Sequence, residues 1–131
     1  MYDGINGMIQ RTTRGVVSVR PDVENHVFNG HQLGREDIAK IYGTLTEAIN
    51  SYTAMLCVLN PDDSGRTIVL NNRGFTRYMA GLIRMRHNHP ETRQLLEAAE
   101  QDLTEASKSS LGAAAINLQR VKKALSGELS K

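Results

Sequence analysis

Arginine is the residue type in this sequence whose number and spacing best suit binding chemistry. The chain has 11 arginines but only 5 lysines, and the planar guanidinium forms paired hydrogen bonds with phosphate or carboxylate groups. Five arginines fall between residues 66 and 89, a stretch without any acidic residue. This pattern predicts a segment that binds the phosphates of duplex DNA or an acidic protein surface.

The neighbouring segments have the opposite charge. Residues 36–65 hold five acids against one lysine, and residues 91–105 hold five acids against one arginine. Such blocks can pair helices within a fold, so the arginines have a second interpretation as partners of the 91–105 segment. The predicted phosphate-binding or acidic-partner residues are Arg73, Arg77, Arg84 and Arg86, together with Arg11 and Arg14 near the N-terminus.

The other reactive residue types do not form the patterns that catalysis or metal binding requires. The four histidines have no cysteine or carboxylate pair at ligand spacing nearby, so we expect no metal and no cofactor. Cys57 lies in an apolar run and is predicted to be a small buried side chain. Because the sequence also lacks a phosphate-binding glycine loop and a nucleophile elbow, we expect a protein that is not an enzyme.

Residues 1–34 are predicted to be separate from the rest of the chain. Val16, Val17 and Val19 form a short β-type run, and Asn29-Gly30 is a turn dipeptide. The segment is therefore either a small hairpin or a flexible arm, and residues 67–70 read as a further strand that could pair with it. The sequence leaves open whether this part is ordered.

Residues 35–131 are predicted to form a helical domain. Apolar residues recur at steps of three or four over 35–59, 74–88, 91–106 and 110–126, which is typical of amphipathic helices. We therefore expect a mainly α protein, a small bundle of four to five helices. The last two helices form a predicted hairpin with a narrow, alanine-rich stripe, which either joins copies of the chain into a homo-oligomer or packs on the 35–59 helix.

The segment 36–52 has a spacing that suits DNA recognition. Ala39 is followed four residues later by Gly43 and six residues after that by Ile49, and residues 44–47 form a capping box. This stretch resembles the helix-turn-helix of the small Cro-type phage repressors. The resemblance implies a bend at Gly43 and a recognition helix with base-reading side chains. These would be Thr46, Glu47, Asn50 and Ser51. The alternative is one amphipathic helix that tolerates a glycine.

The overall composition is that of one globular domain. The chain has 131 residues, of which 40% are hydrophobic and 23% charged, with a net charge of +2. No apolar run is long enough to span a membrane and the first residues do not resemble a secretory signal, so we expect a cytoplasmic protein. Two functions follow: a phage-like DNA-binding regulator with a helix-turn-helix, or a protein–protein adaptor or inhibitor that does not bind DNA.

Overall fold

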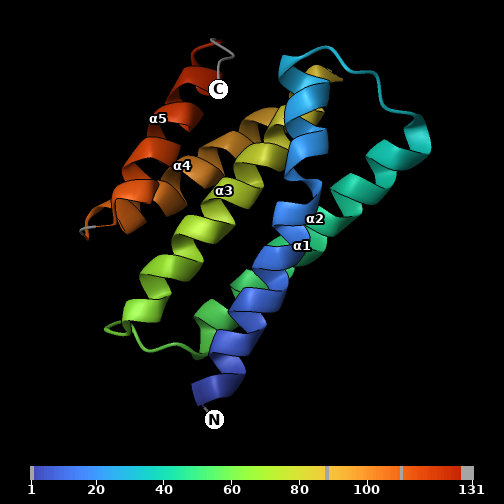
Figure 1. Ribbon diagram of the computed structural model, residues 1–131. Helices are drawn as coiled ribbons and strands as arrows, with labels where there is room; N and C mark the ends of the chain where they lie inside the picture. Colours follow the sequence, from blue (N-terminus) through green and yellow to red (C-terminus); the bar gives the residue numbers. More distant parts are fainter. Residues whose placement is uncertain (1, 88, 110, 128–131) are drawn as a thin grey trace.

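The computed structural model describes residues 2–87, 89–109 and 111–127, and these residues form a bundle of five helices (Figure 1). This confirms the predicted mainly α bundle. Within the described ranges there is no β-strand. The helices are α1 (Tyr2–Phe28), α2 (Arg35–Val58), α3 (Ser64–Arg86), α4 (Thr92–Ser107) and α5 (Gly112–Leu125).

The predicted N-terminal β element is wrong, because the segment forms the long helix α1. Val16 and Val23, seven residues apart, are both buried on the face that packs on the rest of the bundle, whereas Val17 points outwards. The valine run has local β propensity, and burial of one helical face overrides it. Residues 67–70 lie in α3, where Val69 and Leu70 are buried, so the expected strand is wrong as well.

Helix α2 is continuous, and the bend predicted at Gly43 is absent. Positive φ angles occur only at Gly30 and Gly127 among the described glycines. The buried stripe of α2 passes Gly43 without interruption, since it consists of Ile41, Leu45, Ala48, Tyr52 and Met55. Packing of this stripe compensates for a mid-helix glycine, which costs about 1 kcal/mol. Cys57 lies on the opposite side of α2 and is exposed, so its predicted burial is wrong.

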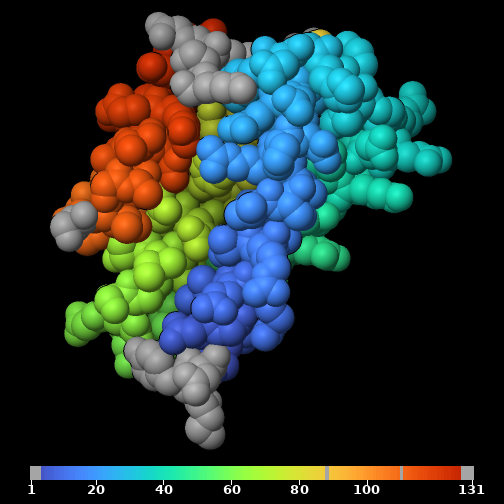
Figure 2. Space-filling view, in the orientation of Figure 1, coloured from blue at the N-terminus to red at the C-terminus, as the bar shows by residue number. Residues whose placement is uncertain are grey.

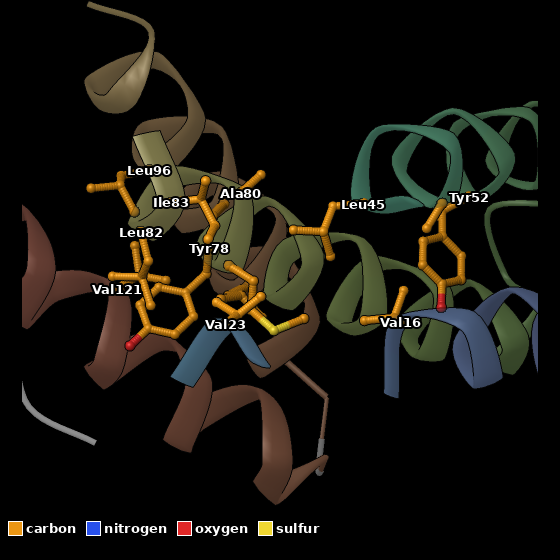
Figure 3. Close-up of a cluster of buried hydrophobic side chains, with 14 of the residues drawn as sticks. Val16, Val23, Leu45, Tyr52, Tyr78, Ala80, Leu82, Ile83, Leu96 and Val121 are labelled. Carbon is orange, nitrogen blue, oxygen red and sulfur yellow. The ribbon is translucent and has the colours of Figure 1, made fainter. Parts of the chain in front are cut away.

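Helix α3 is the centre of the bundle and contacts each of the other four helices. Buried side chains from all five helices meet around it, as the cluster with Val23, Leu45, Tyr78, Leu96 and Val121 shows (Figure 3). Two glycines of α3 let α4 approach closely. A Cβ atom at Gly74 would lie 2.7 Å from Cγ of Leu103, and one at Gly81 would lie 2.8 Å from Cδ2 of Leu96.

The predicted C-terminal helical hairpin is confirmed as α4 and α5, with a turn between them. The apolar stripe of α4 is buried within this chain, and α4 contacts α3 and α5 but not α2. The partner of the α4 stripe within the chain is α3 instead of the 35–59 helix, and the predicted homo-oligomer stays a prediction. The described helices include none with the length and apolarity needed to cross a membrane.

Candidate docking groove

A groove runs between α1 and α5, and α3 forms its floor. Both outer helices pack on α3, and no Cα atom of α1 lies within 8 Å of a Cα atom of α5 among the described residues. The space-filling view shows the surface of α3 recessed between them (Figure 2). The groove encloses about 380 Å³. Its walls are Thr13, Val16, Val17 and Arg20 of α1 and Ala113, Ile116, Asn117 and Arg120 of α5, and its floor includes Asn71, Asn72, Phe75 and Thr76 of α3.

The two walls carry apolar side chains that are largely open to solvent. Val17 on α1 is 58% exposed and Ile116 on α5 is 59% exposed. Phe75 contributes a ring between them from the floor. An apolar surface inside a polar groove is a common feature of binding sites. A second hollow continues the groove along α1 towards its N-terminus, where Ile9 and Arg14 join the lining.

The polar groups of the floor are fixed by hydrogen bonds that connect four helices. Thr13 Oγ1 lies 2.7 Å from the hydroxyl of Tyr52, and Asn72 Nδ2 donates to the same Thr13 oxygen at 3.2 Å. Asn117 Nδ2 donates to Asn71 Oδ1 at 3.1 Å. Burial raises the pKa of Tyr52, although the hydrogen bond with Thr13 opposes this shift. The floor is therefore a neutral, ordered surface.

The charges along the groove are all positive. Among the described residues, three arginines and no carboxylate line the groove and its continuation. Arg20 lies 4.8 Å from the centre of the Phe75 ring and is partly neutralised by Glu24, at 3.3 Å. Arg120 donates from Nη1 to Asn117 Oδ1 at 2.9 Å, and none of the described carboxylates forms an ion pair with it. Of the two arginines on the groove walls, Arg120 is thus the one that forms no ion pair with a described carboxylate, whereas Arg20 pairs with Glu24.

The field of Arg120 reaches the aromatic core under the groove. Tyr78 lies on α3 and is buried. Burial raises the pKa of Tyr78 and is the largest cause of its shift, while the positive charge of Arg120 opposes it. A bound carboxylate would offset part of the charge that Arg120 brings to this end of the groove.

The four arginines predicted on 73–86 do not form one cationic face. Arg73 donates from Nη2 and Nε to both oxygens of Asp102, at 2.7 and 2.9 Å. Arg77 donates from Nη1 to Asp102 Oδ2 at 2.7 Å. For these two residues the second interpretation, pairing with the acidic 91–105 segment, is correct. Arg84 stacks on Tyr42 at 3.7 Å, and these three side chains therefore support the fold.

The remaining predicted cations are spread over the surface. Arg86 is exposed near the end of α3, and Arg11 and Arg14 are exposed on α1. Of these, Arg14 lines the continuation of the groove. The structure thus brings one of the six predicted arginines to the groove and leaves Arg11 and Arg86 outside it.

The predicted base-reading residues lie in the middle of α2. Thr46, Glu47 and Asn50 are exposed and Ser51 is half-buried. Without a bend, no short second helix projects from the surface to enter a DNA groove. Residues 41–65 also contain no lysine or arginine that could contact phosphates.

Sequence analysis missed the residues that form the groove. Val17 and Arg20 have no predicted binding role, because residues 1–34 are expected to be a hairpin or an arm, and Phe75 is expected only on the apolar face of the 74–88 helix. Ile116 and Arg120 fall outside the apolar stripe of the 110–126 helix, formed by Leu111, Ala114, Leu118, Val121 and Leu125. An isoleucine on the polar side of an amphipathic helix is the one local signal that could have indicated this surface.

A histidine pair lies at the other end of α1. His26 is buried, its Nδ1 lies 2.9 Å from the carbonyl oxygen of His31, and its Nε2 lies 3.2 Å from Nε2 of His87. The described residues contain no group of three or more side chains that could hold a metal ion. Comparison of the chain with protein-family models, with curated proteins and with solved structures finds no match.

Proposed function

We propose that this chain is a non-enzymatic protein-binding module, an adaptor or an inhibitor, that binds an acidic segment of another protein in the groove between α1 and α5. The observation that supports this proposal best is the lining of the groove. It combines exposed Val17 and Ile116 on facing walls with Arg14, Arg20 and Arg120, and the described part of it contains no carboxylate. Apolar side chains and arginine are enriched at the centres of protein interfaces.

The distribution of charge over the helices also favours an acidic partner. Helices α3 and α5 contain no acidic residue, and neither do residues 4–21 of α1. The exposed carboxylates of the bundle belong mainly to α2 and α4, among them Glu36, Glu47, Glu97 and Glu105. Because the helix segments that line the groove carry no acidic residue, the groove side would attract an acidic segment and orient it as it approaches.

The geometry favours a protein partner over duplex DNA. A DNA-binding surface needs several cations spaced to contact successive phosphates. Here Arg73 and Arg77 are paired with Asp102, and the two groove walls present Val17 and Ile116 beside their arginines. The continuous α2 removes the bend on which the predicted recognition helix depended.

A selection from a library of unstructured linear peptides displayed on phage tests this proposal. We expect the immobilised protein to enrich peptides with bulky apolar and acidic residues. The enriched peptides should lose binding to the variant Ile116→Asp and keep it with Val58→Asp, a matched control because Val58 is 68% exposed on α2. Peptides that bind both variants equally would contradict the proposal, and so would salt-sensitive binding of duplex DNA with no peptide enrichment.

A further inference from the structure

We infer that the groove binds its partner segment as an amphipathic α-helix in which a bulky apolar residue is followed three or four positions later by a glutamate. This inference rests on the proposed function and specifies its ligand. It depends on a feature of the two walls, each of which places an arginine one helical turn beyond an exposed apolar residue. On α1 these are Val17 and Arg20, and on α5 they are Ile116 and Arg120.

The two walls place these pairs in the same order along the groove. Helices α1 and α5 run in the same general direction on either side of α3 (Figure 1). Each wall therefore presents its apolar residue at one level and its arginine about one turn further along the groove, Val17 before Arg20 on α1 and Ile116 before Arg120 on α5. One helical turn rises about 5.4 Å, so a ligand must place its carboxylate about one turn from its apolar anchor to reach both levels.

A helix meets this requirement better than an extended segment. Side chains three or four apart in a helix lie on one face at this spacing. An extended segment usually binds by pairing with a sheet edge or by docking on exposed aromatic rings. The walls are helices with internally bonded backbones, Tyr52 is buried below the floor, and Phe75 lies under Arg20. The amide of Asn117 on the α5 wall donates a hydrogen bond to the amide oxygen of Asn71 on the floor.

The size of the groove indicates how much of the partner it holds. The lining of α1 extends from Ile9 to Arg20, which corresponds to about 16 Å at 1.5 Å per residue. A partner helix of about three turns would cover this length. The C-terminal end of the partner helix is the negative end of its dipole, and cations such as Arg20 and Arg120 stabilise it. We therefore expect the partner helix to run parallel to α1, with the glutamate after the apolar residue.

Fluorescence anisotropy with designed peptides at low salt tests this inference. The probe is a fluorescein-labelled, alanine-rich 14-residue peptide with a leucine followed four residues later by a glutamate. One comparison peptide has lysine in place of that glutamate, and another has proline at the central position, which disrupts the helix. We expect at least about a tenfold weaker Kd for the lysine peptide and about a hundredfold weaker Kd for the proline peptide.

Protein variants locate the binding of the probe. We expect Ile116→Asp and Arg120→Gln to weaken binding at least about tenfold. The matched controls Val58→Asp and Arg93→Gln should change it less than about twofold, because Val58 and Arg93 are exposed and do not line the groove. Circular dichroism checks the fold of each variant, and we expect all four to be folded because the substitutions are at exposed or partly exposed positions.

These experiments separate a failure of the helix inference from a failure of the proposed function. If the proline peptide binds as tightly as the probe, and Ile116→Asp abolishes both, the ligand is extended and only the helix inference is overturned. If the lysine peptide binds equally well, the acidic partner of the proposed function is overturned together with the inference. If Ile116→Asp instead converts a dimer of the protein into a monomer, the groove is occupied by a second copy, which overturns both.

Discussion

Asp102 on α4 is a buried carboxylate, only 5% exposed, and a buried charge is stable only when it is paired and hydrogen-bonded. It accepts hydrogen bonds from both Arg73 and Arg77, so its charge is compensated by two guanidinium groups. The pairing also removes these arginines from any external partner. Residues that the sequence suggests as a binding surface are thus part of the contact between α3 and α4.

Replacing Asp102 by alanine should destabilise the fold strongly. The substitution leaves two largely buried guanidinium groups without their counter-charge, and such losses cost about 3 kcal/mol or more in the free energy of unfolding. Urea unfolding followed by circular dichroism measures this loss. Arg93→Ala is the matched control, because Arg93 pairs with Glu97 in a 73% exposed position and should change stability by less than about 0.5 kcal/mol. Equal effects of the two substitutions would contradict the assigned role of Asp102.

His87 makes the stability of the protein depend on pH. Desolvation lowers the pKa of His87 below its ordinary value of 6.5, with further contributions from His26, Arg86 and Arg84. The folded state therefore binds the proton less readily than the unfolded state. This contribution to stability is present above about pH 6.5 and is lost as the pH falls further.

Urea unfolding at several pH values between about 7.5 and about 5.5 tests this dependence. We expect the free energy of unfolding to decrease towards the acidic end, and His87→Gln to reduce the slope because the variant cannot titrate there. The exposed residue His31 supplies a control, since His31→Gln keeps the backbone carbonyl that contacts His26. An unchanged slope in His87→Gln, or a loss of slope only in His31→Gln, would show that the assignment to His87 is wrong.

Among the helices, the contact between α3 and α4 is the closest packed, and two glycines seven residues apart make it so. Gly74→Ala and Gly81→Ala should each destabilise the protein by about 1–3 kcal/mol, because the new methyl groups would overlap buried Leu103 and Leu96. Thermal unfolding measures both. If both substitutions raise the melting temperature, the close approach of α4 to α3 is wrong.

Gly43→Ala should have the opposite effect. No atom lies within 4 Å of a Cβ built on Gly43, and its φ angle is not positive, so alanine should stabilise the continuous helix α2 by about 1 kcal/mol. The melting temperature reports the sign of the change. A marked loss of stability would indicate a left-handed turn at residue 43, as the helix-turn-helix resemblance implies.

The sequence predicted the helices well where one apolar stripe continues over several turns, as in residues 35–59, 91–106 and 110–126. It failed for residues 1–28, because the five valines and three glycines there have weak local helix propensity, and only the contact with the bundle shows that Val16 and Val23 share one buried face. The false bend at Gly43 has a related cause. The spacing of a few residues does not show that the apolar stripe of α2 is buried both before and after Gly43.

At the level of the whole molecule, the candidate site depends on three helices that are distant in sequence. No local pattern could join Val17, Phe75 and Ile116, since their proximity arises only when α1 and α5 pack on the same face of α3. The excess of arginine predicts an affinity for acidic partners, and this affinity stays a prediction. Two of the six arginines expected to provide it, Arg73 and Arg77, instead pair with Asp102 of the acidic helix α4.

The central claim is that the side of the bundle formed by α1, α3 and α5 binds an acidic protein segment. The most direct measurement is a titration of the ¹⁵N-labelled protein with the acidic helical peptide, followed by backbone amide NMR. We expect the largest shift changes to cluster around Val17, Phe75, Ile116 and Arg120, and to disappear in Ile116→Asp. Changes centred on the exposed side of α2, around Glu47 and Asn50, or no saturable changes at all, would contradict the account.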